Sequence, residues 1–238
     1  MVEWYLRKPL KIIIRGLMNK YSEQKSVTEL TAEKIREAII LGSFPLGTKL
    51  SEQKLADLYE VSRSPVREAL VLLQIEGLVR IFPKRGSFVF SPDERTIVDL
   101  CEHRNVLETV SLKLGIERNH ASLLSGLELG IDQMQTAIET KNTKDYSLGD
   151  LKFHRTIIAS SGNRSMIAVY ETTIGRLIAL RTHLFTVSGV QTDRSMSEHI
   201  EILRACEKKD IARAQAICTE HINHLAEHVA DANLKSTF

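Results

Sequence analysis

The sequence is poor in cysteine and contains no long apolar segment. Its three cysteines, at positions 101, 206 and 218, show no paired spacing, which excludes a disulfide framework and indicates a reducing compartment. No apolar run approaches the roughly 18 residues that a membrane span requires, and no signal peptide with a small-residue cleavage site is visible. We therefore expect a cytoplasmic protein that makes no contact with a membrane.

Composition places the chain among ordinary folded proteins. With 43% hydrophobic and 26% charged residues, its 238 residues suffice for two domains, each with a core of its own. The net charge is only +2, but residues 1–25 carry six Lys or Arg against two Asp or Glu, whereas residues 93–238 carry 17 against 20. This lean of positive charge toward the N-terminal side is a mild indication of nucleic-acid binding.

Residues 50–89 predict the plan of the N-terminal domain. Helical apolar periods and capping residues alternate there with tight turns. The expected elements are, in order, a helix from a Ser51 cap to Tyr59, a turn at Glu60 and Val61, a helix from a Ser62 cap to about Gly77, and strands at 78–82 and 87–90 joined by a turn at 83–86. A preceding helix at 27–42 would complete the core. This order predicts a winged helix-turn-helix.

The second helix of this motif carries the residues expected to meet DNA. Arg63, Ser64 and Arg67 occupy its outer face near the start, where such donors reach base edges and phosphates. Lys84 and Arg85 add two positive charges at the tip of the hairpin. Because isolated exposed arginines are more often solvated surface residues, the interpretation depends on the whole pattern.

The runs VSRSPVREAL, EGLVR and PKRGSFV closely resemble the DNA-binding domain of GntR-type bacterial transcription regulators, over about residues 28–91. The resemblance implies that Arg63, Ser64, Arg67 and Gly86 approach DNA. Many members have an arginine where this chain has Gln53, which implies a weaker or different contact at that position. The full set that we expect at the DNA is Ser51, Gln53, Arg63, Ser64, Arg67, Lys84, Arg85 and Gly86.

The sequence Ser91-Pro92-Asp93 marks the expected domain boundary, because proline breaks strand pairing and serine or aspartate can cap a new helix. Helical periodicity then returns in six blocks, near 94–118, 122–141, 145–159, 163–188, 194–207 and 210–234. We therefore predict a mainly α protein with an extension at 1–26, a winged helix-turn-helix at 27–91 and an all-α bundle of about six helices at 92–238. For the extension, a packed helix or a segment without function is favoured over a mobile basic arm.

Four residues of the bundle form a candidate metal site. Asp150 and His154 are four apart, so they face the same way from successive helical turns. His199 and His221 lie in two later helices among apolar residues that mark core-facing stripes. Carboxylates and imidazoles that face inward need a partner, which a divalent metal can supply. The alternative for each histidine is a core residue bonded to a backbone carbonyl.

The helical half is similar to the FCD-type ligand-binding domain of the FadR-like branch of GntR regulators, over about residues 95–230. In metal-containing members an Asp and a His four apart, then a His in each of two later helices, bind the metal. The resemblance therefore implies Asp150, His154, His199 and His221 as ligands. One aspartate and three imidazoles suit zinc, our first expectation, and also nickel, manganese or iron. Such a set leaves one or two positions open for water or an anion.

An effector site is expected beside the metal. Arg104 and Glu108 are one helical turn apart, and such an arginine is suited to bind a carboxylate through two hydrogen bonds. The alternative is an ordinary surface ion pair. The resemblance implies that this arginine contacts the effector, and Asn163 and Arg181 are further candidates for the same pocket. An arginine near an open metal position suggests a small organic acid.

The resulting hypothesis is a homodimeric transcription regulator, expected to be a repressor, that binds a near-palindromic double-stranded DNA operator and responds to a small organic acid. Two alternatives stay open. One is a sensor of the metal itself without an organic effector. The other is a metal-dependent hydrolase, for which the sequence offers no free carboxylate at motif spacing to act as general base.

Overall fold

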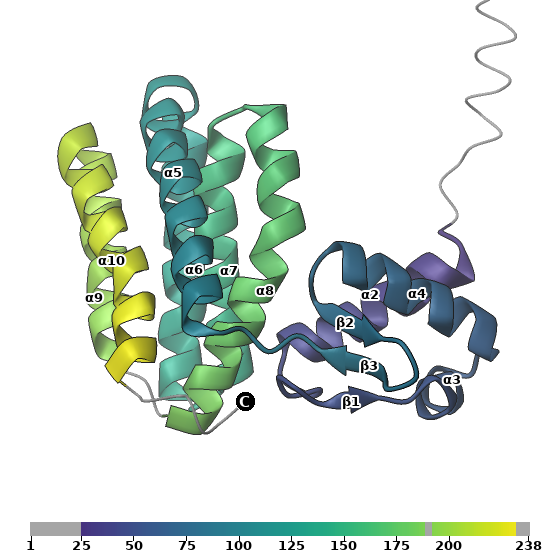
Figure 1. Ribbon diagram of the computed structural model, residues 1–238. Helices are drawn as coiled ribbons and strands as arrows, with labels where there is room; N and C mark the ends of the chain where they lie inside the picture. The colour runs from purple at the N-terminus through teal and green to yellow at the C-terminus, as the bar shows by residue number, and fades with distance from the viewer. Residues whose placement is uncertain (1–24, 189–191, 232–238) are drawn as a thin grey trace, which may run out of the picture.

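The structure, a computed structural model, describes residues 25–188 and 192–231, and the side chains of residues 25–183 and 193–224 among them. The expectation for the N-terminal extension thus lies outside the described residues, apart from its last two positions. Figure 1 shows two parts side by side, a smaller one of short helices with a sheet and a larger one of long helices. None of the described helices combines the length and the apolar character of a membrane span.

The smaller part is a winged helix-turn-helix, as predicted. Its elements are α2 (Val27–Ile40), β1 (Lys49–Leu50), α3 (Glu52–Tyr59), α4 (Arg63–Ile75), β2 (Val79–Phe82) and β3 (Gly86–Val89). The three strands form an antiparallel sheet in the order β1-β3-β2, in which Val79 pairs with Val89 and Phe82 with Gly86. β1 was not expected, because two residues are too few to show a strand period. α2 also ends before the expected Gly42.

Caps and turns explain the local geometry of the helix-turn-helix. Ser51 caps α3, with its Oγ accepting a hydrogen bond from the Lys54 backbone nitrogen at 3.4 Å. Glu60 then adopts a left-handed conformation with φ of 56°, which turns the chain toward α4. Ser62 is the N-cap of α4, but its side chain makes no capping hydrogen bond. The buried stripe of α4 consists of Val66, Ala69, Leu70 and Leu73.

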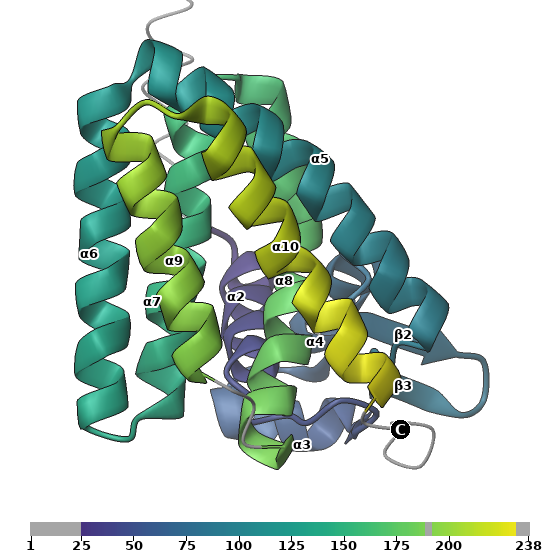
Figure 2. The same ribbon diagram turned by 90° about the vertical axis from the view of Figure 1, so that its left-hand side faces the viewer.

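The larger part is the predicted six-helix bundle. Its helices are α5 (Glu94–Arg118), α6 (His120–Glu139), α7 (Thr143–Ser160), α8 (Arg164–Ser188), α9 (Thr192–Glu207) and α10 (Ile211–Asp231). Asp93 begins α5, with its Oδ1 accepting from the Thr96 nitrogen at 2.8 Å. In Figure 2, α9 and α10 lie over the face of the bundle that α5, α6 and α7 form, and α8 lies behind them. Buried side chains of α7, α9 and α10 meet in the interior, namely Asp150, His154, His199 and His221.

Close helix packing fixes the position of α7. A side chain at Gly130 of α6 would place its Cβ 3.1 Å from the backbone of Phe153, and Gly149 of α7 lies equally close to α6. Such approaches require glycine and leave α7 little freedom to shift. The central residues of α7 are therefore held rigidly against the bundle.

The two parts meet at α8. Gly175 of α8 lies against Leu78 and Ile40 of the winged helix-turn-helix, and Gly77 lies against Arg176. Figure 1 shows α8 on the side of the bundle that faces the smaller part. The same helix carries Arg181, which reaches into the bundle interior.

Candidate metal centre and nucleic-acid interface

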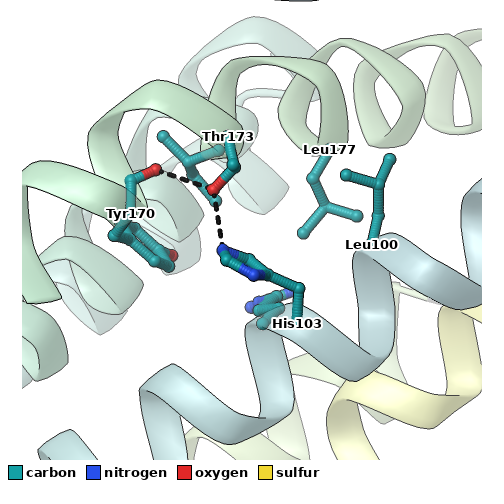
Figure 3. Close-up of a pocket in the computed structure, with 7 residues that line it drawn as sticks. Leu100, His103, Tyr170, Thr173 and Leu177 are labelled. Atoms are coloured by element: carbon teal, nitrogen blue, oxygen red, sulfur yellow. Dashed lines mark hydrogen bonds between the residues drawn. The ribbon is translucent and has the colours of Figure 1, made fainter.

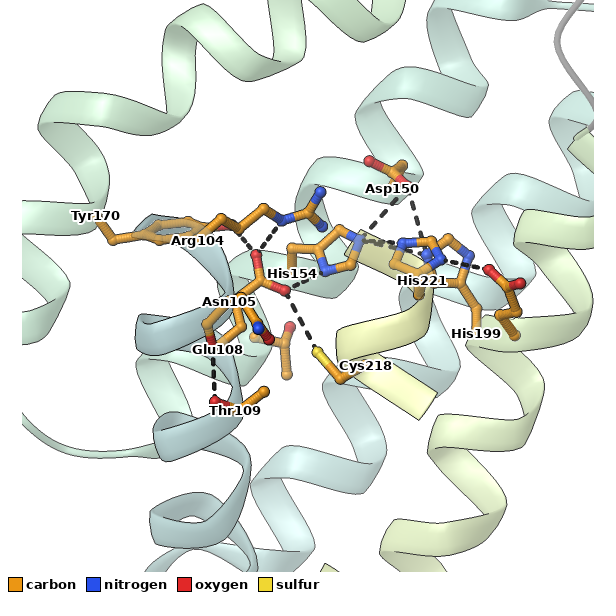
Figure 4. Close-up of polar contacts among 12 residues, drawn as sticks. Arg104, Asn105, Glu108, Thr109, Asp150, His154, Tyr170, His199, Cys218 and His221 are labelled. Atoms are coloured by element: carbon orange, nitrogen blue, oxygen red, sulfur yellow. Dashed lines mark hydrogen bonds and ion pairs between the residues drawn. The ribbon is translucent and has the colours of Figure 1, made fainter. Parts of the chain in front are cut away.

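Three imidazoles and one carboxylate meet inside the bundle, from α7, α9 and α10 (Figure 4). Nε2 of His154 lies 3.3 Å from Nε2 of His199 and 3.2 Å from Nε2 of His221. Oδ1 of Asp150 lies 3.4 Å from Nε2 of His199 and 3.6 Å from Nε2 of His154. The four sequence-predicted metal residues are thus brought together, with all four donor atoms within 4.8 Å of one another.

Two carboxylates hold the Nδ1 side of two of the three histidines. Nδ1 of His154 lies 2.9 Å from Oε2 of Glu108, and Nδ1 of His221 lies 3.0 Å from Oε2 of Glu198. An ionised carboxylate only accepts, so Nδ1 of each of these two rings carries a proton, which leaves Nε2 as the atom through which a neutral ring binds a metal. The Nε2 atoms of His154 and His221 face each other at 3.2 Å. Histidines that bind metals are held in this way by outer carboxylates.

Burial and neighbouring charges set the protonation states of Asp150, His199 and His221 in a way that favours a cation. Burial lowers the pKa of His199 and of His221 well below the usual range, which keeps both rings neutral. Burial raises the pKa of Asp150, but Arg181 and His154 outweigh it and hold that pKa well below its usual range. One oxygen of Asp150 pairs with Nη1 of Arg181 at 2.7 Å, while Oδ1 has no hydrogen-bond partner among the described residues.

The donor set fits a metal. In a tetrahedral zinc site, Zn–N bonds of about 2.0–2.1 Å place the ligand nitrogens roughly 3.3 Å apart, which is the spacing of the Nε2 atoms here. Neutral imidazoles and an ionised carboxylate are the protonation states that ligation requires. A buried carboxylate oxygen without a hydrogen bond is costly unless it has a partner, and a cation would provide one.

Arg104 and Glu108 form a buried ion pair, so the surface alternative for them is wrong. Nε of Arg104 donates to Oε1 of Glu108 at 2.5 Å, and the two side chains are 4% and 0% exposed. The same oxygen accepts from the Tyr170 hydroxyl at 2.9 Å. Burial raises the pKa of Glu108, but the charges of Arg104 and His154 outweigh it and lower that pKa overall. Glu108 thus lies behind His154 with both oxygens engaged by the protein.

The other effector candidates occupy different places. Arg181 reaches the centre through Asp150. Asn163 caps α8 instead, because its Oδ1 accepts from the backbone nitrogens of Ser165 at 3.1 Å and Met166 at 3.2 Å. None of the contacts described for Asn163 brings it to the centre, and its effector role stays a prediction.

A small cavity lies beside Arg104, between α5 and α8 (Figure 3). Tyr170 and Thr173 line its α8 side, and Nε2 of His103 lies 3.2 Å from the Thr173 hydroxyl. Its volume of about 10 Å³ is about the space that one water molecule needs. An organic acid therefore fits this cavity only if α5 and α8 separate.

Helix α4 presents Arg63 and Arg67 at the surface, where both pair with one carboxylate. Arg63 donates to Glu52 at 3.1 Å, and Arg67 donates to both Glu52 oxygens at 3.2 and 2.8 Å. The neighbouring predicted DNA contacts are also engaged, because Ser64 donates to Glu68 at 3.2 Å and Gln53 to Asp57 at 2.8 Å.

The hairpin tip has the expected turn chemistry. Lys84 and Gly86 have positive φ of 62° and 102°, and the guanidinium of Arg85 lies 5.4 Å from the ring centre of Phe82. Phe82 packs edge-on to Phe88 at 5.8 Å. Arg85 thus stacks on Phe82 of this aromatic pair, and the DNA roles of Lys84, Arg85 and Gly86 stay predictions.

Sequence reasoning missed three residues that organise these sites. Glu198 and Tyr170 contact His221 and Glu108 across helices, so no local spacing signalled them. Glu52 directly follows the Ser51 cap, in the first turn of α3. An acidic residue there is already explained by its favourable interaction with the helix dipole. Its contact with α4 had no sequence signature.

A winged helix-turn-helix joined to a helical bundle with a buried polar centre is the architecture of a DNA-binding transcription regulator. Residues 28–89 match the bacterial regulatory proteins of the gntR family, and residues 99–224 match the FCD domain. The chain therefore belongs to the GntR family of bacterial transcription regulators and carries an FCD domain. These regulators are not enzymes, which decides against the hydrolase alternative.

The chain is similar to several proteins of this family. It is 32% identical to the gluconate operon transcriptional repressor of Bacillus licheniformis over 152 residues, which cover 64% of this chain and 62% of that repressor. It is 28% identical to the HTH-type transcriptional regulator YdhC of Bacillus subtilis, over 82% of this chain and 87% of that protein. A GntR-type regulator from Rhodococcus sp. RHA1 has the same fold, with a TM-score of 0.79, 22% identity, and coverage of 87% of this chain and 99% of that one.

Proposed function

We propose that this protein is a cytoplasmic homodimeric repressor whose helical domain binds a divalent metal and a small organic acid, and whose affinity for a near-palindromic operator changes with that ligand. The single observation that supports metal binding most strongly is the meeting of three imidazoles: Nε2 of His154 lies 3.3 Å from Nε2 of His199 and 3.2 Å from Nε2 of His221, while Nδ1 of His154 and Nδ1 of His221 each face a carboxylate on the other side. Asp150, His154, His199 and His221 would hold the metal. When bound, the metal supplies an open coordination position for an acidic oxygen.

Two buried arginines favour an anionic effector. Arg181 pairs with Asp150, and Nη2 of Arg104 is buried without a hydrogen-bond partner among the described residues. A buried guanidinium donor of this kind is satisfied by a carboxylate with two oxygens. Since the cavity beside Arg104 is too small for an acid, binding would separate α5 from α8, and α8 also contacts the winged helix-turn-helix. A ligand that favours the separated state would thereby shift the DNA-binding domain.

Elemental analysis by mass spectrometry tests the metal. The protein, purified without chelator, is expected to hold close to one equivalent of metal, with zinc first. A His199→Ala/His221→Ala variant is expected to hold none. His103→Gln is the matched control, because His103 lies on α5 and contacts Thr173 rather than the cluster. Absence of metal from the parent after reloading with zinc would contradict the proposal.

A metal sensor without an organic effector is the remaining alternative, since the centre alone would support it. Operator affinity measured across buffered free zinc, with and without a panel of small carboxylic acids, distinguishes the two. Under the proposal an acid changes the affinity at saturating metal. Under the alternative, the operator affinity changes with the free zinc concentration, and none of the acids alters it.

A further inference from the structure

Glu52, the first residue of α3, joins α3 to two successive turns of α4. Its Oε2 accepts from Nη2 of Arg63 at 3.1 Å, while Arg67 donates through Nε to Oε1 at 3.2 Å and through Nη2 to Oε2 at 2.8 Å. Arg67 therefore binds the carboxylate with both arms of its guanidinium. One carboxylate fixes both arginines that are expected to meet DNA.

Folding stability does not explain this arrangement. The side chains of Arg63 and Arg67 are 58% and 64% exposed, and exposed ion pairs contribute little to stability. Hydrogen bonds from Arg67 lower the pKa of Glu52, so the carboxylate stays charged at neutral pH. A negative charge on a surface that must approach phosphates weakens binding to any DNA. Its presence there calls for a role in DNA binding itself.

We infer that Glu52 positions Arg63 and Arg67 for base reading and suppresses their attraction to DNA of unrelated sequence. The inference rests on the proposed DNA contacts of these two arginines. A guanidinium has five N–H donors, so each arginine can keep a hydrogen bond to Glu52 while two other donors reach O6 and N7 of a guanine. In a complex that makes only phosphate contacts, the same carboxylate lies near the phosphates and no base hydrogen bond offsets the repulsion. Glu52 therefore weakens non-specific binding more than specific binding.

The neighbouring residues support this assignment to Glu52. Gln53, the next side chain on α3, donates to Asp57 of the same helix at 2.8 Å, and Ser64 of α4 donates to Glu68 of its own helix at 3.2 Å. Glu52 alone among these groups crosses from α3 to the arginines of α4.

The test compares two DNA probes. One is a duplex that the wild-type protein recovers from a random library by in vitro selection, and the other has the same bases in shuffled order. Fluorescence anisotropy gives the Kd for each over a series of KCl concentrations. Glu52→Gln is isosteric and removes the charge, and Glu37→Gln is the matched control, because Glu37 is an exposed acid of α2 in the same domain.

Glu52→Gln is expected to bind the shuffled duplex about tenfold more tightly, because one more cation becomes available to phosphates, with the slope of log K against log salt steeper by about one. The ratio of affinities for the selected and shuffled duplexes falls by at least about the same factor. Glu37→Gln leaves ratio and slope near those of the wild type.

A second variant separates charge from position. Glu52→Asp keeps the charge but shortens the side chain, so it is expected to bind the shuffled duplex as weakly as the wild type while losing affinity for the selected one. The inference is overturned if Glu52→Gln weakens both duplexes equally with an unchanged salt slope, or changes neither. Failure of the wild-type protein to prefer any selected sequence would instead refute the proposed DNA contacts.

Discussion

Nδ1 of His154 lies 2.9 Å from a carboxylate oxygen of Glu108, and the other oxygen of that carboxylate accepts from Arg104 and Tyr170. A candidate metal ligand on α7 is thereby tied to α5 and α8 through one buried acid. Breaking a buried pair by removing one partner is costly, because it leaves an uncompensated charge. The orientation of His154 and the packing of three helices depend on the same side chain.

Glu108→Gln is therefore expected to lower the free energy of unfolding by about 3–5 kcal/mol, because Arg104 keeps its charge in a buried site without a counter-ion. Urea denaturation followed by circular dichroism measures this. Glu171→Gln serves as control, since Glu171 pairs with Arg155 at the surface. If Glu108→Gln lowered the free energy of unfolding no more than the control does, Glu108 would not be needed to balance the buried charge of Arg104.

Glu198→Gln tests the outer contact of His221 at lower cost to the fold. Glu198 is 16% exposed, and loss of such an orienting carboxylate lowers metal affinity by about 10- to 100-fold. Competition with a zinc-binding dye measures the affinity. Glu201→Gln on the same helix α9, whose partner is the surface Arg213, is expected to bind zinc as the parent does. Equal affinities in the two variants would argue against an orienting role.

Metal removal is expected to destabilise the protein. A ligand at about 100 times its Kd adds about 2.7 kcal/mol to the free energy of unfolding, so zinc added to the stripped protein at that excess should raise Tm, and a chelator should reverse the rise. Differential scanning calorimetry measures both. The His199→Ala/His221→Ala variant is expected to show neither response, and a response in it as large as in the parent would place the metal elsewhere.

Base and phosphate contacts are expected to respond differently to mutation. Arg63→Ala should cost about 1–3 kcal/mol of binding and relax sequence preference, since it removes a base-edge donor. Lys84→Ala, at the wing tip, should weaken binding to all sequences alike and reduce the salt slope by about one. Titrations of both variants with selected and shuffled duplexes check this. An unaltered affinity and footprint in Arg63→Ala would count against its role.

Gly130→Ala is expected to destabilise the bundle by about 1–3 kcal/mol, because its Cβ would press on the backbone of Phe153, which cannot give way as a side chain end can. In Gly175→Ala the new Cβ would meet the tip of Leu78 at 3.3 Å, and the gain in helix propensity of up to about 1 kcal/mol offsets that contact. Thermal unfolding of both variants tests the contrast, which equal Tm values would contradict.

Periodicity and capping residues were enough to predict the elements of this fold. The six bundle helices begin and end within a few residues of their expected limits, because long amphipathic helices give strong periodic signals. β1 was not predicted, because a strand of two residues is too short to show alternating apolar and polar positions. Local pairs such as Asp150 and His154 were equally accessible from their spacing.

Contacts between side chains of different helices could not be predicted from periodicity or local spacing. Glu198 meets His221 over 23 residues, and Glu108 meets Tyr170 over 62, and only the packed bundle defines such pairs. Burial of Arg104 and Glu108 depends likewise on which helices cover α5, so their spacing alone did not distinguish a buried ion pair from a surface one. Glu52 likewise pairs with Arg63 and Arg67, which are 11 and 15 residues away in the sequence, and only the packing of α3 against α4 brings them together.

The unbroken length of α5 has a mechanical consequence. Its 25 residues form one helix from the junction with β3 to the far end of the bundle, and Glu108 lies 14 residues from its beginning at Glu94, or about 21 Å at 1.5 Å per residue. A rotation of this rod by about three degrees around Glu108 moves its beginning by about 1 Å. A small tilt of α5 at Glu108 would thus be enlarged at the beginning of the helix, next to the winged helix-turn-helix.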